Sequence, residues 1–333
     1  NFSDSRYNEK TLRLITQMHK AITIIQLKLE AAIIDRRPEL GMGNRKLLHL
    51  IDFERGVFMY DGKEYALRDT NFPTIDPADP YRLTEEEHDL MEKIHASFMN
   101  SEKLKKHMRC LFTYGGMYLV CNSNLLYHAS VPLNADGSFK HVVINGKEYW
   151  GEKLLKKVDQ LVRTAYFGED GSDEKAFALD YMWYMWCGPD APSFDKDKMA
   201  TFERYFVEDK SLHKETKGYY YTLRNEVEVC NRILREFGID PEAHAHIING
   251  HVPVKTIKGE QPIKAEGKML VIDGGFSKAY QPETGIAGYT LVYHSHGLQL
   301  VQHEPFTSTQ KAIEEGQDIK AVCAEYLFMQ QRL

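Results

Sequence analysis

Two histidines occupy the same unusual setting in this sequence. His128, in NLLYHASVP, ends an apolar run and precedes small residues and a proline; His251, in HIINGHVPVK, has the same setting after an added glycine. A neutral imidazole at the carboxyl end of a strand lies where α/β proteins gather their functional loops. It can bind a divalent metal through one nitrogen while a backbone carbonyl holds the other. We predict that Gly250 lets the backbone turn sharply and that Pro253 stiffens the loop.

Either histidine alone is more often structural than a metal ligand. The repeated context favours metal binding, but residue types and spacing leave both interpretations open at this point. The other histidines divide into two groups. Those on highly charged segments fit a solvated surface, and those near predicted strand ends fit either a cluster or exposed positions beside a turn. The first group is His88, His95, His107 and His213, and the second is His294, His296 and His303.

Composition sets the broad class of the protein. The 333 residues are 43% hydrophobic and 27% charged, which is typical of a globular protein with an ample core. No apolar run reaches the roughly 18 residues of a membrane span, so no membrane partner is expected. The net charge of −6 argues against a broad nucleic-acid surface. Five scattered cysteines without C-x-x-C spacing favour a reducing cytoplasm over a cysteine zinc site.

Helical and extended segments alternate along the chain without a regular β-α-β order. Apolar residues that recur every three or four positions predict helices, with a capping box at Thr84 and Glu87. Turn signals at Asp61-Gly62, Asn122-Ser123-Asn124 and Asn145-Gly146 predict hairpins. Predicted helices span residues 9–34, 45–53, 84–99, 101–115, 151–166, 172–186 and 223–237, with a last one from 308, and late strands span 246–249, 268–273, 288–295 and 297–303.

This order of elements predicts an α/β fold with a mixed or sandwiched sheet flanked by helices, and a helical N-terminal region. A boundary is expected near residues 100–115. Asp273 is predicted to be buried and hydrogen-bonded in a turn, and Trp183 and Trp186 are predicted to lie in the core rather than to stack on a sugar. The polar N-terminus, NFSDSRYNEK, has no initiator Met and no signal-peptide pattern, so we expect the chain to be part of a longer protein.

Several long stretches resemble the class III fructose-1,6-bisphosphatases, a divergent branch of the metallophosphoesterases. The resemblance runs from about Leu12 to His303 and is carried by NSNLLYHASVPLN, SEKLKKHMRCLFTYGGMYL, MATFERYF, HIINGHVPVK and GKMLVIDGGFSKAYQPETGIAGYTL. In that superfamily a two-metal centre lies at the carboxyl edges of two stacked sheets. The last of its signature blocks are a strand-end histidine and a Gly-His block. The resemblance therefore implies that His128 and His251 are metal ligands.

The earlier signature blocks, Asp-x-His, Gly-Asp-x-x-Asp-x-Gly and Gly-Asn-His-Asp/Glu, do not occur in this sequence. The resemblance thus implies the C-terminal half of a longer enzyme. Residues 1–110 would form a mainly helical region with a β-hairpin, and residues 111–333 the C-terminal half of the metallophosphoesterase domain. The catalytic histidine and the remaining ligands would come from the missing N-terminal half of the same polypeptide. We therefore expect no catalytic residue in this chain and negligible activity from it alone.

The resemblance implies hydrolysis of fructose 1,6-bisphosphate to fructose 6-phosphate and phosphate, with Mn²⁺ as the expected metal. The phosphate that is not cleaved needs cations, for which Arg204, Lys255 and Lys278 are candidates, although each could be an ordinary surface cation. A homo-oligomer is left open. Two alternatives also remain: a related metallophosphoesterase acting on phosphoproteins or dinucleoside polyphosphates, and a non-catalytic domain that binds a partner.

Overall fold

The computed structural model describes residues 7–273, 275, 277, 279–294, 297–305, 308–316 and 322–328, the last range by its backbone alone. Contacts divide the chain into two compact units, and both are discontinuous in sequence. The domain boundary predicted near residue 110 stays a prediction. Unit 1 comprises Asn1–Gly115, Glu169–Gly188 and Lys196–Thr216, and unit 2 comprises Gly116–Gly168, Pro189–Asp195 and Lys217–Leu333.

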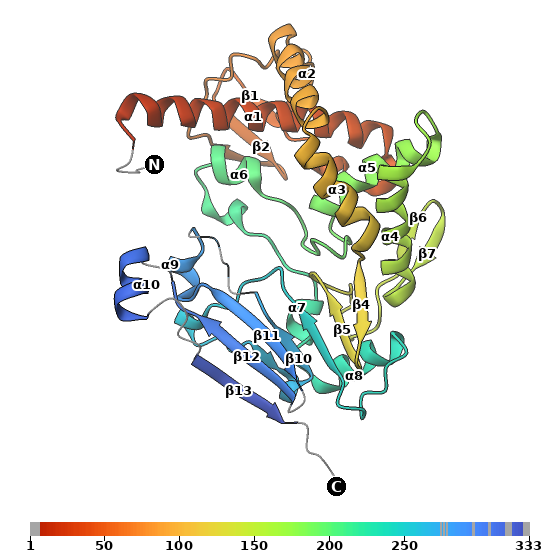
Figure 1. Ribbon diagram of the computed structural model, residues 1–333. Helices are drawn as coiled ribbons and strands as arrows, with labels where there is room; N and C mark the ends of the chain where they lie inside the picture. The colour runs from red at the N-terminus through yellow and green to blue at the C-terminus, as the bar shows by residue number, and fades with distance from the viewer. Residues whose placement is uncertain are drawn as a thin grey trace. The chain divides into compact units, whose positions relative to one another are not determined.

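Unit 1 is mainly helical (Figure 1). It carries one small antiparallel sheet, in the order β1-β2-β3. Its core joins helix α1 to the sheet and to α6, and the rings of Phe58 and Phe202 lie 4.9 Å apart between their centroids. The predicted capping box is present, since Thr84 and Glu87 bond to each other's backbone amides at the start of α2. The α-helices are α1 (Glu9–Arg36), α2 (Glu85–Met99), α3 (Glu102–Tyr114), α5 (Asp173–Cys187) and α6 (Thr201–Phe206); the 3₁₀ helices are η1 (Pro38–Leu40), η2 (Gly43–Arg45), η3 (Leu48–Leu50) and η4 (Lys210–His213); the strands are β1 (Ile51–Asp52), β2 (Val57–Tyr60) and β3 (Lys63–Ala66).

The helix predicted over residues 45–53 is wrong. The structure has two 3₁₀ turns there and then strand β1, in which Ile51 pairs with Phe58. Leu47 and Leu48 are both buried in the same core. Adjacent apolar residues can be buried together when the chain changes direction between short turns, whereas a helix would separate them around its axis. Long-range packing therefore overrode the local helical pattern.

Unit 2 contains a five-stranded mixed sheet in the order β4-β5-β8-β10-β9. The three central strands β5, β8 and β10 are parallel, and β4 and β9 are antiparallel to their neighbours. A second sheet, β11-β12-β13, is antiparallel, and β6 and β7 form a separate hairpin. The strands are β4 (Tyr118–Cys121), β5 (Asn124–Tyr127), β6 (Val142–Ile144), β7 (Lys147–Tyr149), β8 (His246–Asn249), β9 (Ile263–Lys264), β10 (Met269–Val271), β11 (Gly288–His294), β12 (Gly297–His303) and β13 (Val322–Phe328).

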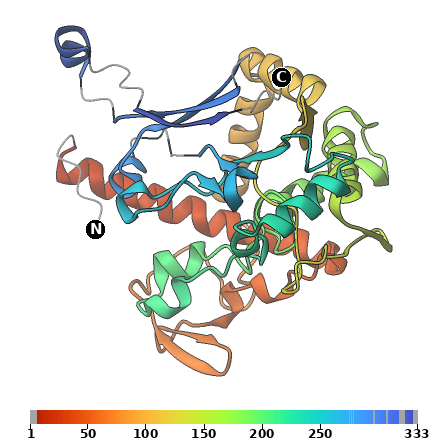
Figure 2. The ribbon, with the colours of Figure 1, turned by 90° about the horizontal axis from the view of Figure 1, so that it is seen from below.

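Alternating side chains of the mixed sheet are buried on both of its faces. Ile247 packs with residues of helix α8 on one face, whereas the next residue, Ile248, packs with Leu298 of β12 on the other. Figure 2 shows the blue strands of the second sheet on one side of β10 and helix α8 (teal) on the other. The predicted α/β class is therefore confirmed. The helices of unit 2 are α4 (Gly151–Phe167), α7 (Tyr220–Leu223), α8 (Val227–Glu236), α9 (Gln281–Thr284) and α10 (Thr309–Glu315), with 3₁₀ helices η5 (Thr256–Lys258) and η6 (Ala265–Gly267).

Within the described part of the chain, no helix has both the length and the apolar character that crossing a membrane would require.

Candidate functional site

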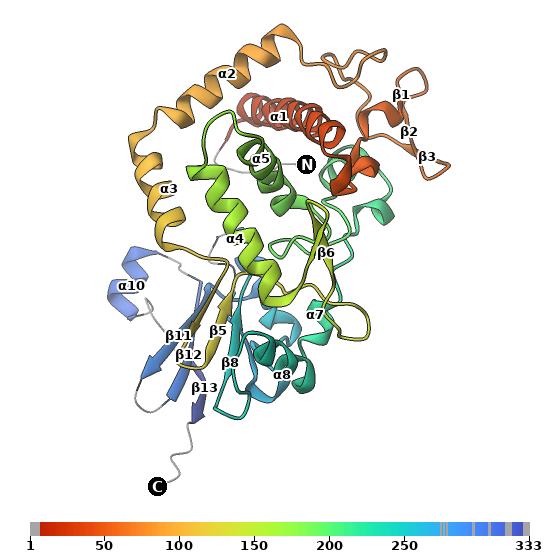
Figure 3. The same ribbon diagram turned by 90° about the vertical axis from the view of Figure 1, so that its right-hand side faces the viewer.

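The two histidines singled out by the sequence follow neighbouring strands of the mixed sheet. His128 comes directly after β5, and His251 comes two residues after the end of β8. Strands β5 and β8 are hydrogen-bonded in parallel and lie side by side in Figure 3. Because parallel strands end at the same edge of a sheet, this topology delivers both side chains to one place.

The imidazoles of His128 and His251 converge. Nε2 of His128 lies 3.1 Å from Nδ1 of His251, and the ring planes are inclined at 74°. With metal–nitrogen bonds of about 2.1 Å, two neighbouring ligand nitrogens on one ion are about 3.0 to 3.4 Å apart. The donor set therefore fits one first-row divalent ion. The same distance also allows a hydrogen bond between one protonated and one unprotonated ring nitrogen.

The sharp turn in the second loop lies at His251 itself. Its φ is +68°, in the left-handed region that most non-glycine residues avoid, and the amide of Val252 donates to the carbonyl of Gly250 at 2.8 Å. A bond from residue i+2 to residue i around a positive φ is typical of the rarer, strained type of γ-turn. The prediction that Gly250 makes the turn is therefore wrong. A Cβ at Gly250 would meet its nearest atoms at 3.5 to 3.7 Å, which is ordinary contact.

Buried hydrogen bonds tie the two histidine loops together. The amide of Gly250 donates to the carbonyl oxygen of His128 at 2.9 Å. The side chain of Asn249 donates through Nδ2 to the carbonyl oxygen of Ala129 and to the hydroxyl oxygen of Tyr220, both at 2.8 Å. The Tyr220 hydroxyl also contacts that of Tyr127 at 2.8 Å. One polar network thus reaches residues adjacent to both histidines.

Burial strongly raises the pKa of the two tyrosine hydroxyls in this network. Both tyrosines are therefore neutral at physiological pH, and each can donate one proton and accept another. Such hydroxyls suit a fixed hydrogen-bonding frame rather than proton transfer. The network consequently supports the shape of the site and adds no charge to it.

Asp273 lies beside the histidine loops, where hydrogen bonds engage its side chain and its backbone. Its Oδ1 accepts a bond from the amide of Gly275 at 3.0 Å, and its carbonyl accepts one from Val254 at 2.7 Å. The half-buried side chain is thus engaged in a turn. Among the described residues, no third histidine, cysteine or carboxylate forms with His128 and His251 a group whose ligand atoms all lie within 4.8 Å of one another.

The three candidate phosphate-binding cations have different surroundings. Lys255 lies just beyond the His251 loop, where its Nζ is 3.6 Å from a carboxylate oxygen of Glu283. Arg204 belongs to unit 1, where Nη2 is 3.2 Å from Glu215. Lys278 lies outside the described residues. The cation nearest in sequence to the histidine pair is therefore already engaged with a carboxylate that a phosphate would have to displace.

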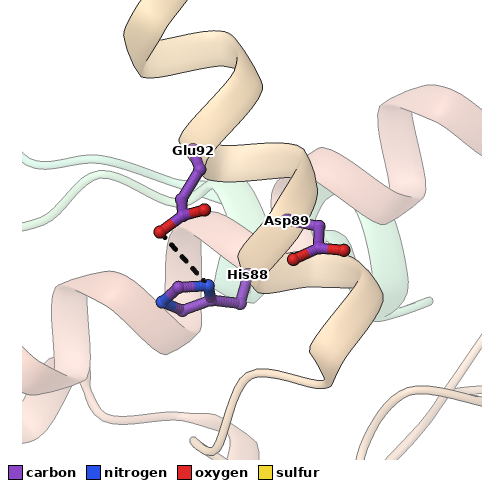
Figure 4. A group of neighbouring side chains, drawn as sticks. All are labelled: His88, Asp89 and Glu92. Atoms are coloured by element: carbon purple, nitrogen blue, oxygen red, sulfur yellow. Dashed lines mark ion pairs between the residues drawn. The ribbon is translucent and has the colours of Figure 1, made fainter.

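A different group of possible metal ligands occurs on helix α2 of unit 1. Figure 4 shows the side chains of His88, Asp89 and Glu92, whose ligand atoms all lie within 4.8 Å of one another. All three are exposed, and Nδ1 of His88 is 3.8 Å from Glu92 one helical turn away. An ion pair between residues i and i+4 on a solvated helix accounts for this arrangement without an ion.

Comparisons with known proteins agree with the resemblance. A family model described as Firmicute fructose-1,6-bisphosphatase matches residues 1–332. The chain belongs to this family. Relatives named fructose-1,6-bisphosphatase class 3 include those of Bacteroides fragilis, at 81% identity over 333 residues, and Bacteroides thetaiotaomicron, at 79% over 334 residues; each match covers 100% of this chain and 50% of the relative. A third, from Clostridium novyi, is 57% identical over 311 residues, covering 93% of this chain and 47% of the relative. The chain spans about half the length of these curated relatives. No solved structure matches it.

The structure adds one feature to the fructose-1,6-bisphosphatase resemblance: the buried hydrogen-bond network of Asn249, Tyr220 and Tyr127 behind the two histidine loops. The residue types and spacing did not single out Asn249 or Tyr220. A signal for Asn249 was present, because an amide at the end of the apolar run HIIN must find hydrogen-bond partners when it is buried. Tyr220, in GYYYTL, has no comparable local signal, since three adjacent tyrosines do not indicate which ring turns inward.

Proposed function

We propose that the whole protein hydrolyses fructose 1,6-bisphosphate to fructose 6-phosphate and phosphate, and that His128 and His251 are ligands of one divalent metal ion. The observation that carries this proposal is the 3.1 Å approach of Nε2 and Nδ1 at the ends of two parallel strands. The reaction is proposed from the names of the relatives, which are fructose-1,6-bisphosphatases. This reading accounts for two histidines in one sequence context, which a purely structural interpretation leaves to coincidence.

The chemistry explains why imidazoles are needed here. Phosphate monoesters hydrolyse extremely slowly in water, and catalysis requires charge neutralisation and a strong nucleophile, which bound divalent ions supply. The contribution of His128 and His251 is to hold neutral nitrogen donors in a fixed geometry. Two histidines cannot hold two ions, because such centres also need carboxylates to offset charge and to bridge. We propose that those ligands lie in the portion of the relatives' length that this chain does not span.

We propose Mn²⁺ as the bound ion. Imidazole donors combined with carboxylates suit Mn²⁺ and its first-row neighbours, whereas Mg²⁺ prefers oxygen ligands and retains its waters. For the phosphate that is not cleaved, we propose a cationic clamp drawn from Arg204, Lys255 and Lys278. Lys255 has the strongest positional argument, because it follows His251 by four residues and its side chain is 40% exposed.

The edge of the mixed sheet supports the proposal that further protein surface packs against unit 2. Strand β4 is one of the two edge strands of this sheet, and its residues Leu119 and Val120 are 58% and 42% exposed. An unpaired edge with exposed apolar residues invites pairing with another strand. We also propose a reducing cytoplasm as the location, because Cys110 and Cys121 are free thiols at exposed positions.

The decisive experiment measures metal content and phosphate release together in the whole protein. We expect about one ion fewer per chain in His128→Ala and in His251→Ala, with loss of fructose 1,6-bisphosphate hydrolysis. His141→Ala is the matched control, because His141 is an exposed histidine of the same unit that contacts Glu148. Normal metal content and activity in both site variants would disprove the assignment.

A substrate panel separates the alternatives. Preference for a phosphoprotein or a dinucleoside polyphosphate over the sugar bisphosphate would favour a related metallophosphoesterase. A whole protein that binds no Mn²⁺ and releases no phosphate from any of these substrates would favour the non-catalytic, partner-binding alternative.

A further inference from the structure

The strand ends that carry the two histidines are joined by a side chain with no place in the proposed chemistry. Asn249 is the last residue of β8, is 1% exposed, and lies two residues before His251. Its amide nitrogen bonds to the carbonyl oxygen of Ala129, the residue that follows His128. Asn249 therefore spans from one candidate ligand loop to the other.

The cost of burying its amide indicates that Asn249 does not serve stability alone. The other amide atom of Asn249, Oδ1, is buried without a hydrogen-bond partner among the described residues. A buried polar atom without a partner costs about 1 to 3 kcal/mol, whereas an apolar side chain at a strand end would add favourable burial. What the amide contributes is a fixed link between Ala129 and Tyr220, so its benefit lies in geometry.

The turn at His251 makes such a link necessary. A residue with a φ of +68° returns to an extended conformation unless its surroundings hold it, and that change would swing the imidazole away from His128. The loop is held on both sides, by Asn249 and Gly250 before the turn and by the bond from Val254 to the Asp273 carbonyl after it. Among these interactions, the bond from Asn249 to the Ala129 carbonyl is the one made by a side chain.

We propose that Asn249 is a positioning residue for the metal site, and that the Tyr220 hydroxyl fixes the orientation of its amide. The proposal rests on the proposed function, because it requires His128 and His251 to share an ion. The hydrogen bonds of the Asn249 side chain go to the Ala129 carbonyl and the Tyr220 hydroxyl, so Asn249 acts through the backbones of the two loops. Loss of its amide should therefore keep both imidazoles but change their relative orientation. This change weakens metal binding without removing a ligand atom.

The test is Mn²⁺ affinity of the whole protein, measured by calorimetric titration of Asn249→Ala, Tyr220→Phe and Asn124→Ala. We expect Asn249→Ala to weaken binding about 10- to 100-fold, the range found when partners behind a metal ligand are removed. Tyr220→Phe keeps the bond to Ala129 and should weaken binding less, in the same direction. Co²⁺-loaded Asn249→Ala should also show a visible absorption spectrum altered from that of the wild type, which reports changed ligand geometry at full occupancy.

Asn124→Ala is a closely matched control. Asn124 is also a buried asparagine of this sheet, 6% exposed, and its Oδ1 finds no partner among the residues that the structure describes. It lies at the opposite end of β5 from His128. Within the described part of the chain, its Nδ2 donates only to the nearby carbonyl of Asn122, at 3.0 Å. Wild-type Mn²⁺ affinity and Co²⁺ spectrum are expected for this variant, even if its stability falls.

Several outcomes would overturn the proposal. Unchanged affinity and spectrum in Asn249→Ala would do so, as would equal weakening in Asn124→Ala, which would point to general loss of stability. If Asn249→Ala does not fold, unchanged binding in Tyr220→Phe would count against it. Retention of metal in both His128→Ala and His251→Ala would instead refute the proposed function, so the two failures can be told apart.

Discussion

The amide of Gly250 donates a hydrogen bond to the carbonyl oxygen of His128, at 2.9 Å. This bond joins the backbone of one candidate ligand to the residue beside the other, and it does not depend on a bound ion. The 3.1 Å approach of the two imidazoles is thus held by the backbone as well as by whatever the ring nitrogens bind. A site arranged before the metal arrives loses less conformational freedom on binding, which favours affinity.

The positive φ of His251 predicts an inverted order of stability for two substitutions. Left-handed backbone costs residues with a Cβ about 1 kcal/mol or more, and glycine is largely exempt. We therefore expect metal-free His251→Gly to be more stable than metal-free His251→Ala by about 1 kcal/mol, as measured by urea denaturation. The reverse order, which is usual in regular structure, would mean that residue 251 does not keep this conformation in solution.

Asp195 predicts a pH dependence of stability. Its side chain is 5% exposed, and burial raises its pKa from the usual 3.8 to about 6, helped by the charge of Asp190. Between these values the unfolded chain carries an ionised carboxylate while the folded chain keeps its proton. Raising the pH through this window therefore favours unfolding, by roughly 3 kcal/mol for a shift of this size.

The variant Asp195→Asn isolates this effect. Its stability relative to the wild type should rise by about 2 kcal/mol between pH 4.5 and pH 7.5 in urea denaturation, because about two thirds of the window lies in that range. Asparagine tolerates the positive φ of 49° at this position, so the backbone need not change. A wild-type-to-variant difference that stays constant over that pH range would contradict the raised pKa.

A buried ion pair in unit 1 predicts strong non-additivity. Arg45 and Glu203 form two hydrogen bonds, of 2.8 and 3.1 Å, and their side chains are 9% and 0% exposed. Removing Arg45 leaves Glu203 with the more distant Lys198, 3.6 Å away, and removing Glu203 leaves Arg45 without its hydrogen-bonded carboxylate. Arg45→Met or Glu203→Met alone should therefore cost up to about 5 kcal/mol of unfolding free energy. The double variant should be less destabilised than the sum of the two single losses, because the buried guanidinium and the buried carboxylate are removed together.

An exposed pair provides the comparison. Arg82 and Asp76 are 3.0 Å apart with side chains 66% and 45% exposed, so Arg82→Ala should change stability by less than about 1 kcal/mol. Chemical denaturation of the four variants measures both effects. Additive losses in the double variant of Arg45 and Glu203 would show that the pair is more solvated than its burial indicates.

Lys255 and Glu283 predict opposite effects on substrate binding. If the ammonium of Lys255 contacts only the remote phosphate of fructose 1,6-bisphosphate, Lys255→Ala should raise KM more than it lowers kcat. Glu283→Gln should lower KM, because it frees the ammonium from a carboxylate 3.6 Å away. Steady-state kinetics of the whole protein would measure both.

The same kinetic pattern is predicted for Lys278→Ala. Unchanged kinetics in Lys255→Ala would remove that lysine from the clamp and leave Arg204 and Lys278 as candidates. Unchanged kinetics in Lys278→Ala would identify Lys278 as an ordinary surface residue.

Local signals in the sequence predicted the features that depend on neighbouring residues. Three hairpin turns were located from their residues, and each has positive φ values at its centre, as at Asn122 and Ser123. The convergence of His128 and His251 was also predictable, because two similar strand ends in a parallel sheet meet at one edge. Features that depend on distant packing were missed. The conformation of residues 45–53 depends on packing into the core around Phe58. The hydrogen-bond partners of Asn249 lie 120 and 29 residues away in the sequence.

The separation of the two histidines along the chain has a consequence for how the protein folds. They lie 123 residues apart, and the intervening chain includes segments assigned to the other compact unit. The entropic free-energy cost of closing a loop of that length is about 2 kcal/mol higher than that of closing a loop of about ten residues. Pairing of β5 with β8 is therefore a slow, non-local step compared with formation of the helices. If the whole protein binds Mn²⁺ through this pair, as proposed, that ability should appear during refolding well after the helical circular-dichroism signal, so that metal uptake marks completed chain assembly.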